Sequence, residues 1–199
     1  MSQDHLSRCG WCGDSADYQA YHDHVWGRPV AASQELFEKL CLDGQQAGLS
    51  WITILRKQQG YRDAYCQFDP AAIVQMPNQQ REKLIENPEI IRNKLKIKSI
   101  FQNAEAYLRL QDEGIDFNQY LWSFSDGQPR IHRWQQLSQV PVYDDVAEKM
   151  SKALKKRGFN FVGPTICYAF MQAVGMVNDH LVDCHCYADV CQQAEQFTL

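Results

Sequence analysis

Two glycines bound a short turn in Ala153-Leu-Lys-Lys-Arg-Gly-Phe-Asn-Phe-Val-Gly-Pro-Thr165. Apolar residues at helical spacing lie on both sides of this turn, and Phe170 and Ala173 continue the pattern after it. Pro164 suits the first turn of a helix, where its missing N–H costs no hydrogen bond. The stretch therefore predicts a helix-hairpin-helix element at about 151–175. An ordinary helical hairpin without a binding role is the alternative.

The N-terminus of the second helix is a candidate phosphate site. Free backbone N–H groups at a helix N-terminus bind anions. The basic run Lys152–Arg157 lies just before the turn and adds positive charge. A second basic run, Arg92–Lys98, is equally compatible with a solvated helix face. The net charge of −4 and the pI of about 5.8 count mildly against a broad nucleic-acid surface, but they do not exclude a local patch.

Helical patterns dominate the rest of the chain, and no segment shows the period-two alternation of a strand. The fold class is all-α. One helical pattern covers residues 50–65 and should break near Gly60. A longer helix should end by Gly114, and residues 125–143 should form a loop with short turns.

The chain has 199 residues, of which 45% are hydrophobic and 22% charged, which suits one globular domain or two merged subdomains. No apolar run is long enough to cross a bilayer, so we expect no membrane partner. The first residues lack the apolar segment of a secretory signal, so a cytoplasmic location is expected.

Eight cysteines in such a chain favour metal binding or burial over disulfides. Three of them lie among apolar residues and should be core: Cys41, Cys66 and Cys167. Cysteines and histidines also gather at the two chain ends, where zinc would find nitrogen and sulfur ligands. Spacing alone does not choose among Cys9, Cys12, His22, His24, His180, Cys184, His185 and Cys186. On a helical turn, His180 and Cys184 would project from one face.

Aromatic residues crowd the N-terminal part of the chain. Each could be core, but together they also suit a box that stacks on a flat cationic ligand. They are Trp11, Tyr18, Tyr21 and Trp26, with Trp51 further on. The segment Cys41–Trp51 contains Asp43, two glutamines and two glycines. It is either a capped helix–helix turn or a turn that presents hydrogen-bonding groups beside Trp51.

Together these motifs resemble the DNA-3-methyladenine glycosylase I family of helix-hairpin-helix glycosylases. The resemblance covers nearly the whole chain in the family's order. It is carried by Arg8–Trp11, Tyr21–Asp23, Trp26–Gly27, Gly44–Trp51, Arg157–Gly163, Val177–His180 and Cys184.

This resemblance implies one all-α glycosylase domain over residues 1–199, made of two helical subdomains with a cleft between them. It also implies a structural zinc ion that joins the chain ends 9–22 and 180–184. The zinc ligands carried over from the family are Cys9, His22, His180 and Cys184.

The implied activity is excision of 3-methyladenine from alkylated double-stranded DNA, without strand cleavage and by a monomer. The nucleotide must leave the stack before its glycosidic bond can be reached. By resemblance, Asp43 contacts the base edge and acts as the catalytic carboxylate. Four aromatic residues would line the pocket: Trp11, Tyr18, Tyr21 and Trp51. Four hairpin residues would contact DNA: Lys155, Gly158, Gly163 and Thr165.

The chain departs from the expected pattern at two positions. Asp43 stands where the family usually has glutamate, which shortens its reach by one methylene. Asn178 stands where many glycosylases of this superfamily have a catalytic aspartate, and the resembling family is similar in lacking that aspartate. The neighbouring Asp179 should point elsewhere. No lysine occupies the expected position of a lyase nucleophile.

Two other function classes fit parts of the pattern. A zinc hydrolase or deaminase would need a glutamate beside a ligand histidine and a Pro-Cys-x-x-Cys motif, which this chain lacks. A catalytically weak or inactive damage-binding module of the same fold would explain the substitution at Asp43.

Overall fold

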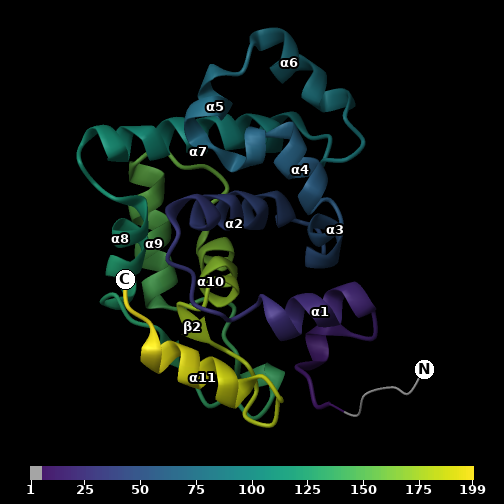
Figure 1. Cartoon of the computed structure of the whole chain (residues 1–199), viewed down its shortest axis with the longest axis vertical. Coiled ribbons are helices and arrows are strands. Elements are labelled where there is room, and N and C mark those ends of the chain that lie inside the picture. Colours follow the sequence, from purple (N-terminus) through teal and green to yellow (C-terminus); the bar gives the residue numbers. More distant parts are fainter. Residues whose placement is uncertain (1–5) are drawn as a thin grey trace.

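The structure is a computed structural model that describes residues 6–199. It is mostly helical, which confirms the all-α prediction (Figure 1). The helices are α1 (Ala16–His24), α2 (Ser33–Gln46), α3 (Trp51–Leu55), α4 (Gln58–Ala64), α5 (Pro70–Gln75), α6 (Asn78–Lys83), α7 (Lys94–Asp112), α8 (Phe117–Trp122), α9 (Asp145–Lys156), α10 (Pro164–Ala173) and α11 (Tyr187–Gln196). Short 3-10 turns are η1 (Gly10–Cys12), η2 (Cys66–Phe68), η3 (Leu84–Glu86), η4 (Ser123–Ser125) and η5 (Leu137–Gln139).

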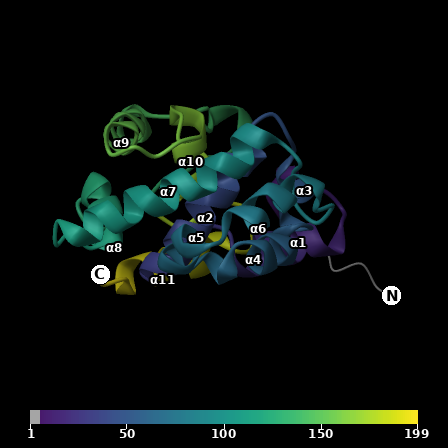
Figure 2. The ribbon, with the colours of Figure 1, turned by 90° about the horizontal axis from the view of Figure 1, so that it is seen from above.

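Helix α2 lies at the centre of the molecule, between α7 and α10 (Figure 1). Its side chains are buried on nearly all faces, including Leu36, Phe37 and Leu40. One hydrophobic core extends from these residues to Val177. Seen from above, α9 and α10 lie on one side of α7, and α1, α4 and α11 lie on the other (Figure 2). The predicted division into two subdomains stays a prediction.

The longest helix begins and ends as its sequence indicates. The side chain of Asn93 accepts hydrogen bonds from the backbone N–H groups of Leu95 and Lys96, which caps the start of α7. Gly114 follows the helix with φ of 75°, a conformation that glycine adopts without a Cβ penalty. Asp69 and Pro70 likewise open α5 as an N-cap and a first-turn proline.

The expected break near Gly60 is wrong. The chain breaks at Arg56 and Lys57, between α3 and α4, and Gly60 lies inside α4. A Cβ at Gly60 would come within 2.5 Å of the Glu89 side chain and carbonyl oxygen. Glycine is present because two backbone segments approach closely at this point, a tertiary cause that local sequence does not show.

Residues 125–143 form turns, as predicted, with one small exception. Two residues of this segment, β1 (Arg130–Ile131), pair in parallel with β2 (Val177–Asn178). The pair is too short for an alternating pattern. Its effect is to hold the 130–140 segment against the residues that follow α10.

Helices α9 and α10 and the turn between them confirm the predicted helix-hairpin-helix. Gly158 ends the first helix with φ of 94°, and a Cβ there would lie 2.6 Å from a guanidinium nitrogen of Arg109. Pro164 occupies the first turn of α10. Among the described residues, no helix is both long and apolar enough to span a membrane.

Candidate active site

A cavity of about 160 Å³ opens to solvent beside the C-terminal end of α2. A space of about 150 Å³ holds a benzene-sized ring in a protein core, so a flat base ring is of the right order of size. The N-terminal segment supplies one wall, formed by Trp11, Tyr18, Tyr21 and Trp26. Trp11 packs against Tyr18 and Trp26 with ring centroids 5.1 and 4.9 Å apart, both edge to face.

Helices α2 and α3 supply the next wall through Asp43, Gln46 and Trp51. Asp43 is 2% exposed, and its Oδ2 atom has no hydrogen-bond partner within residues 6–199. The indole N–H of Trp51 is also buried without a partner. Buried polar atoms are almost always paired. An acceptor and a donor left open in one cavity therefore indicate a ligand that supplies the missing partners.

Burial raises the pKa of Asp43 to about 8, although the nearby Lys39 ammonium acts in the opposite direction. The removal of this carboxylate from water disfavours its charged form. In the empty cavity at neutral pH, Asp43 is therefore mostly protonated and can donate as well as accept a hydrogen bond.

This pKa gives a prediction for stability. A group whose pKa is raised in the folded state contributes stability that is fully present below its unfolded pKa, about 3.9, and lost as pH rises through about 8. We expect Asp43→Asn, which cannot ionise, to gain stability relative to wild type by a few kcal/mol between pH 5 and pH 9. Urea unfolding of both proteins at the two pH values measures this difference. A constant difference would contradict the assigned burial.

The third wall is formed by Ala169, Gln172 and Ala173 of α10 and by Asp179, which follows β2 in the chain. The expectation that Asp179 points elsewhere is wrong. Val177 and Asn178 form β2, which pairs with β1, and residues 179–180 after it are not helical. Asp179 consequently lines the cavity. The amide of Asn178 instead contacts the Tyr187 carbonyl oxygen and the Cys191 sulfur.

Asp179 is held by several donors. Burial raises the pKa of its carboxyl, but four hydrogen bonds outweigh burial and hold that pKa below its usual value. The donors are His132, Trp134, Tyr168 and Gln172. Asp43 and Asp179 therefore line one cavity with pKa values shifted in opposite directions, upward for Asp43 and downward for Asp179.

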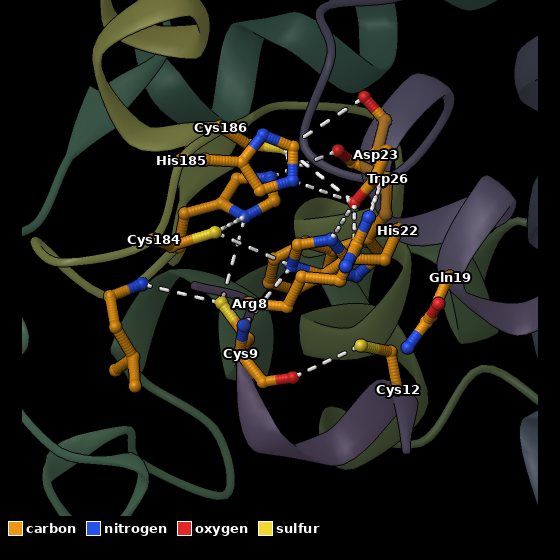
Figure 3. A network of polar contacts seen from close by, with 12 residues as sticks. Arg8, Cys9, Cys12, Gln19, His22, Asp23, Trp26, Cys184, His185 and Cys186 are labelled. Carbon is orange, nitrogen blue, oxygen red and sulfur yellow. Dashed lines mark hydrogen bonds and ion pairs between the residues drawn. The ribbon is translucent and has the colours of Figure 1, made fainter. Parts of the chain in front are cut away.

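A second feature is a buried group of two cysteines and two histidines that joins the chain ends (Figure 3). The ligand atoms of Cys9, His22, His180 and Cys184 all lie within 4.8 Å of one another. The Cys184 sulfur is 3.6 Å from Nε2 of His22 and 3.5 Å from Nδ1 of His180, and the Cys9 sulfur is 3.6 Å from the same Nδ1.

These distances fit a tetrahedral metal. Zinc bonds of about 2.3 Å to sulfur and 2.0–2.1 Å to nitrogen place neighbouring ligand atoms about 3.5 Å apart at a tetrahedral angle. The unused ring nitrogens have partners of their own. Nδ1 of His22 lies 2.7 Å from Asp23, and Nε2 of His180 lies 3.2 Å from the Trp26 carbonyl oxygen. Such partners orient ligand histidines. The group can hold a metal ion.

The remaining end residues surround this group. Cys12 donates to the Cys9 carbonyl oxygen, and His185 and Cys186 contact the Asp23 carboxylate (Figure 3). The segment from His180 to Cys184 forms turns, and these bring both side chains together. Cys66 is exposed, which corrects its assignment to the core, whereas Cys41 and Cys167 are buried as predicted.

The cysteine–histidine group also organises the cavity. Cys9 directly precedes η1, which carries Trp11, and His22 lies on α1 with Tyr18 and Tyr21. The contacts that His180 and Cys184 make with Cys9 and His22 therefore hold the segment that supplies the aromatic wall.

The hairpin presents the predicted contact residues at the surface. Lys155 and Thr165 are exposed, and Gly158 and Gly163 are partly exposed. A Cβ added at Gly163 would meet no atom of the described residues within 4 Å, so the space beside the start of α10 is open.

Comparison with known proteins places this architecture. The sequence model of the methyladenine glycosylase family matches residues 11–187, nearly the whole chain. The chain belongs to the methyladenine glycosylase family. This match confirms the family that the sequence motifs resemble, and the zinc hydrolase or deaminase alternative has no support.

Members of the methyladenine glycosylase family resemble this chain over almost their full length. DNA-3-methyladenine glycosylase 1 of Escherichia coli K12 is 49% identical over 182 residues, which cover 92% of this chain and 97% of the relative. A crystal structure of 3-methyladenine DNA glycosylase I has a TM-score of 0.89 at 49% identity, covering 91% of this chain and all of the other. The Staphylococcus aureus protein has a TM-score of 0.87 at 37% identity, covering 92% and 97%.

Sequence reasoning missed part of the cavity. Leu137 and Val140 line it from the turn segment, and Gln172 and Asp179 line it from the C-terminal half. Gln172 lies two positions after Phe170 on α10 and therefore off the buried face of that helix. This position is the one signal in the sequence that indicates a polar role for Gln172.

Proposed function

We propose that this chain is a base-excision repair glycosylase that removes 3-methyladenine from alkylated DNA. The observation that supports this most directly is the cavity that combines an aromatic wall with unpartnered polar atoms of Asp43 and Trp51. Relatives that share this fold carry the name of that activity, and the S. aureus structure is described as one of 3-methyladenine recognition.

The chemistry follows from the substrate. A base enters such a cavity only after the nucleotide leaves the stack. N3 methylation makes the base cationic, and aromatic faces attract a flat cation. The rings of Trp11, Tyr21 and Trp51 would select it over neutral adenine. As the cation binds, Asp43 would release its proton to solvent, and the resulting carboxylate would accept a hydrogen bond from the base edge.

Bond cleavage needs little acid catalysis. The C1′–N bond breaks with its electron pair going to the base, which departs neutral, and a water oxygen then bonds to C1′ and releases a proton to solvent. Because water is the nucleophile, the reaction stops at the abasic site. The enzyme would therefore be monofunctional.

We further propose that Cys9, His22, His180 and Cys184 hold a structural zinc ion. Two thiolates and two imidazoles are a preferred zinc ligand set, and four protein ligands fill a tetrahedral site. Such an ion would contribute folding free energy and leave the chemistry to the cavity.

Base release from dimethyl-sulfate-treated DNA tests the function. Chromatography of the ethanol-soluble fraction should show 3-methyladenine in proportion to enzyme. If methylated DNA is bound but no free base appears at any enzyme excess, the chain is the inactive damage-binding module instead.

The hairpin gives a prediction for DNA affinity. We propose that Lys155, Thr165 and the backbone at Gly158 and Gly163 contact phosphates. Lys155→Ala should weaken binding of any DNA sequence and lower the slope of log K against log salt by about 1. Fluorescence anisotropy over a salt series measures this slope. The matched control is Lys83→Ala, an exposed lysine on α6, and equal slopes for the two variants would contradict the assignment.

A further inference from the structure

Asp179 is the most strongly hydrogen-bonded carboxylate beside the cavity. Its Oδ1 atom lies 2.5 Å from Nδ1 of His132 and 2.8 Å from the indole nitrogen of Trp134. Its Oδ2 atom lies 2.8 Å from both the Tyr168 hydroxyl and the Gln172 amide nitrogen. The four donors come from the turn segment after β1 and from α10.

This arrangement fixes a negative charge. Each carboxylate oxygen lies within hydrogen-bond distance of two groups that can donate. Four such contacts favour the ionised carboxylate over the protonated acid. The Asp179 side chain has no accessible surface, so solvent screens its charge weakly and its field extends into the adjoining cavity.

The proposed reaction develops positive charge on the deoxyribose. When the glycosidic bond breaks, the base leaves neutral and the deoxyribose carries the positive charge until water adds. A preorganised negative charge near the sugar stabilises this state more than it stabilises the ground state, in which the positive charge lies on the base. Asn178 cannot provide it, because its amide is uncharged and is directed at Tyr187 and Cys191.

Asp43 is poorly suited to this task. Among the described residues 6–199, the Oδ2 atom of Asp43 has no hydrogen-bond partner on the α2 wall. Its environment makes it a ligand for the base edge. Two carboxylates in different surroundings can therefore take two different roles.

We propose that Asp179 supplies the fixed negative charge that stabilises the cationic sugar during base excision. This inference rests on the proposed function and assigns to Asp179 a task that the substitution at Asn178 leaves open. Asp179 acts across space, since its four donors keep its oxygens from bonding the sugar directly.

Two abasic-site analogues in duplex DNA test the charge. A pyrrolidine analogue carries a protonated ring nitrogen, and a tetrahydrofuran analogue is its neutral counterpart. At pH 6.5 the wild-type protein should bind the pyrrolidine duplex tighter than the tetrahydrofuran duplex by on the order of tenfold or more. Asp179→Asn should lose that preference and bind the tetrahydrofuran duplex as wild type does.

Three variants separate charge from structure. Asp112→Asn, an exposed aspartate of α7, should keep the preference. His132→Gln retains an N–H donor but cannot be positively charged, so it should keep or increase the preference. Asp43→Asn should also keep it, since these analogues contain no base for Asp43 to contact. This last variant tests the inference even if Asp179→Asn does not fold.

Several results would overturn the inference. They are no preference in wild type, equal weakening of both duplexes in Asp179→Asn, or loss of the preference in Asp43→Asn. Equal weakening would show that Asp179 only positions the wall. Release of 3-methyladenine by wild type is measured separately, so a failure of the charge inference is distinguishable from a failure of the proposed function.

Discussion

Replacement of Cys184 by serine is expected to lower the melting temperature by about 10 °C or more. Cys184 is buried and its sulfur faces both His22 and His180. Structural zinc binding contributes several kcal/mol of folding free energy, and each kcal/mol corresponds to roughly 2–4 °C in a chain of this size. Serine is a poor zinc ligand, so the variant would lose most of this contribution.

Cys66→Ser is the matched control, because Cys66 is exposed and lies outside the cysteine–histidine group. Differential scanning calorimetry and metal analysis should show near-stoichiometric zinc in wild type and in Cys66→Ser, and none in Cys184→Ser. If the two variants melt together, or if wild type contains no zinc, the structural zinc assignment is wrong.

The same substitution should also affect base release. Trp11 and Tyr21 stand on the segment that Cys9 and His22 anchor. Loss of the metal would loosen one wall of the cavity while Asp43 and Trp51 stay on α2 and α3. We therefore expect activity to fall at temperatures where Cys184→Ser is still folded.

Local features of the sequence explain what could be predicted of the fold. Pro164 starts a helix and Gly158 ends one through their own backbone conformations, so residue type alone predicts the hairpin. The predicted helix break at Gly60 is wrong because glycine is needed there for close contact with Glu89, about thirty positions away in the sequence. The parallel pairing of Arg130 with Val177 is two residues long and leaves no periodic signal.

The site shows the same division. Family resemblance selects the four residues that could hold a metal ion, since the spacing of the end cysteines and histidines fits several ligand sets. Asp179 was misassigned because its direction depends on β2 pairing with β1, a tertiary contact. Residues whose role depends on a distant partner are those that the sequence could not place.

Asp43→Asn is expected to reduce 3-methyladenine release by about 100-fold under single-turnover conditions, in the range found when one charged hydrogen-bonding group of an active site is removed. Asparagine resembles protonated Asp43 in shape, so the empty cavity is preserved. It cannot give up a proton when a cationic base binds, and the charge complementarity of the α2 wall is lost.

The pH profile distinguishes this role from a packing role. In wild type, kcat/KM should rise as pH approaches 8, because less free energy is then needed to ionise Asp43. In Asp43→Asn this rise should be absent, while Asp43→Glu should retain it because a carboxylate remains. The Asn variant should also be the more stable protein at pH 9, so one substitution would lower activity and raise stability, as expected of a residue kept for function. Wild-type activity in both variants would show that Asp43 does not contact the base.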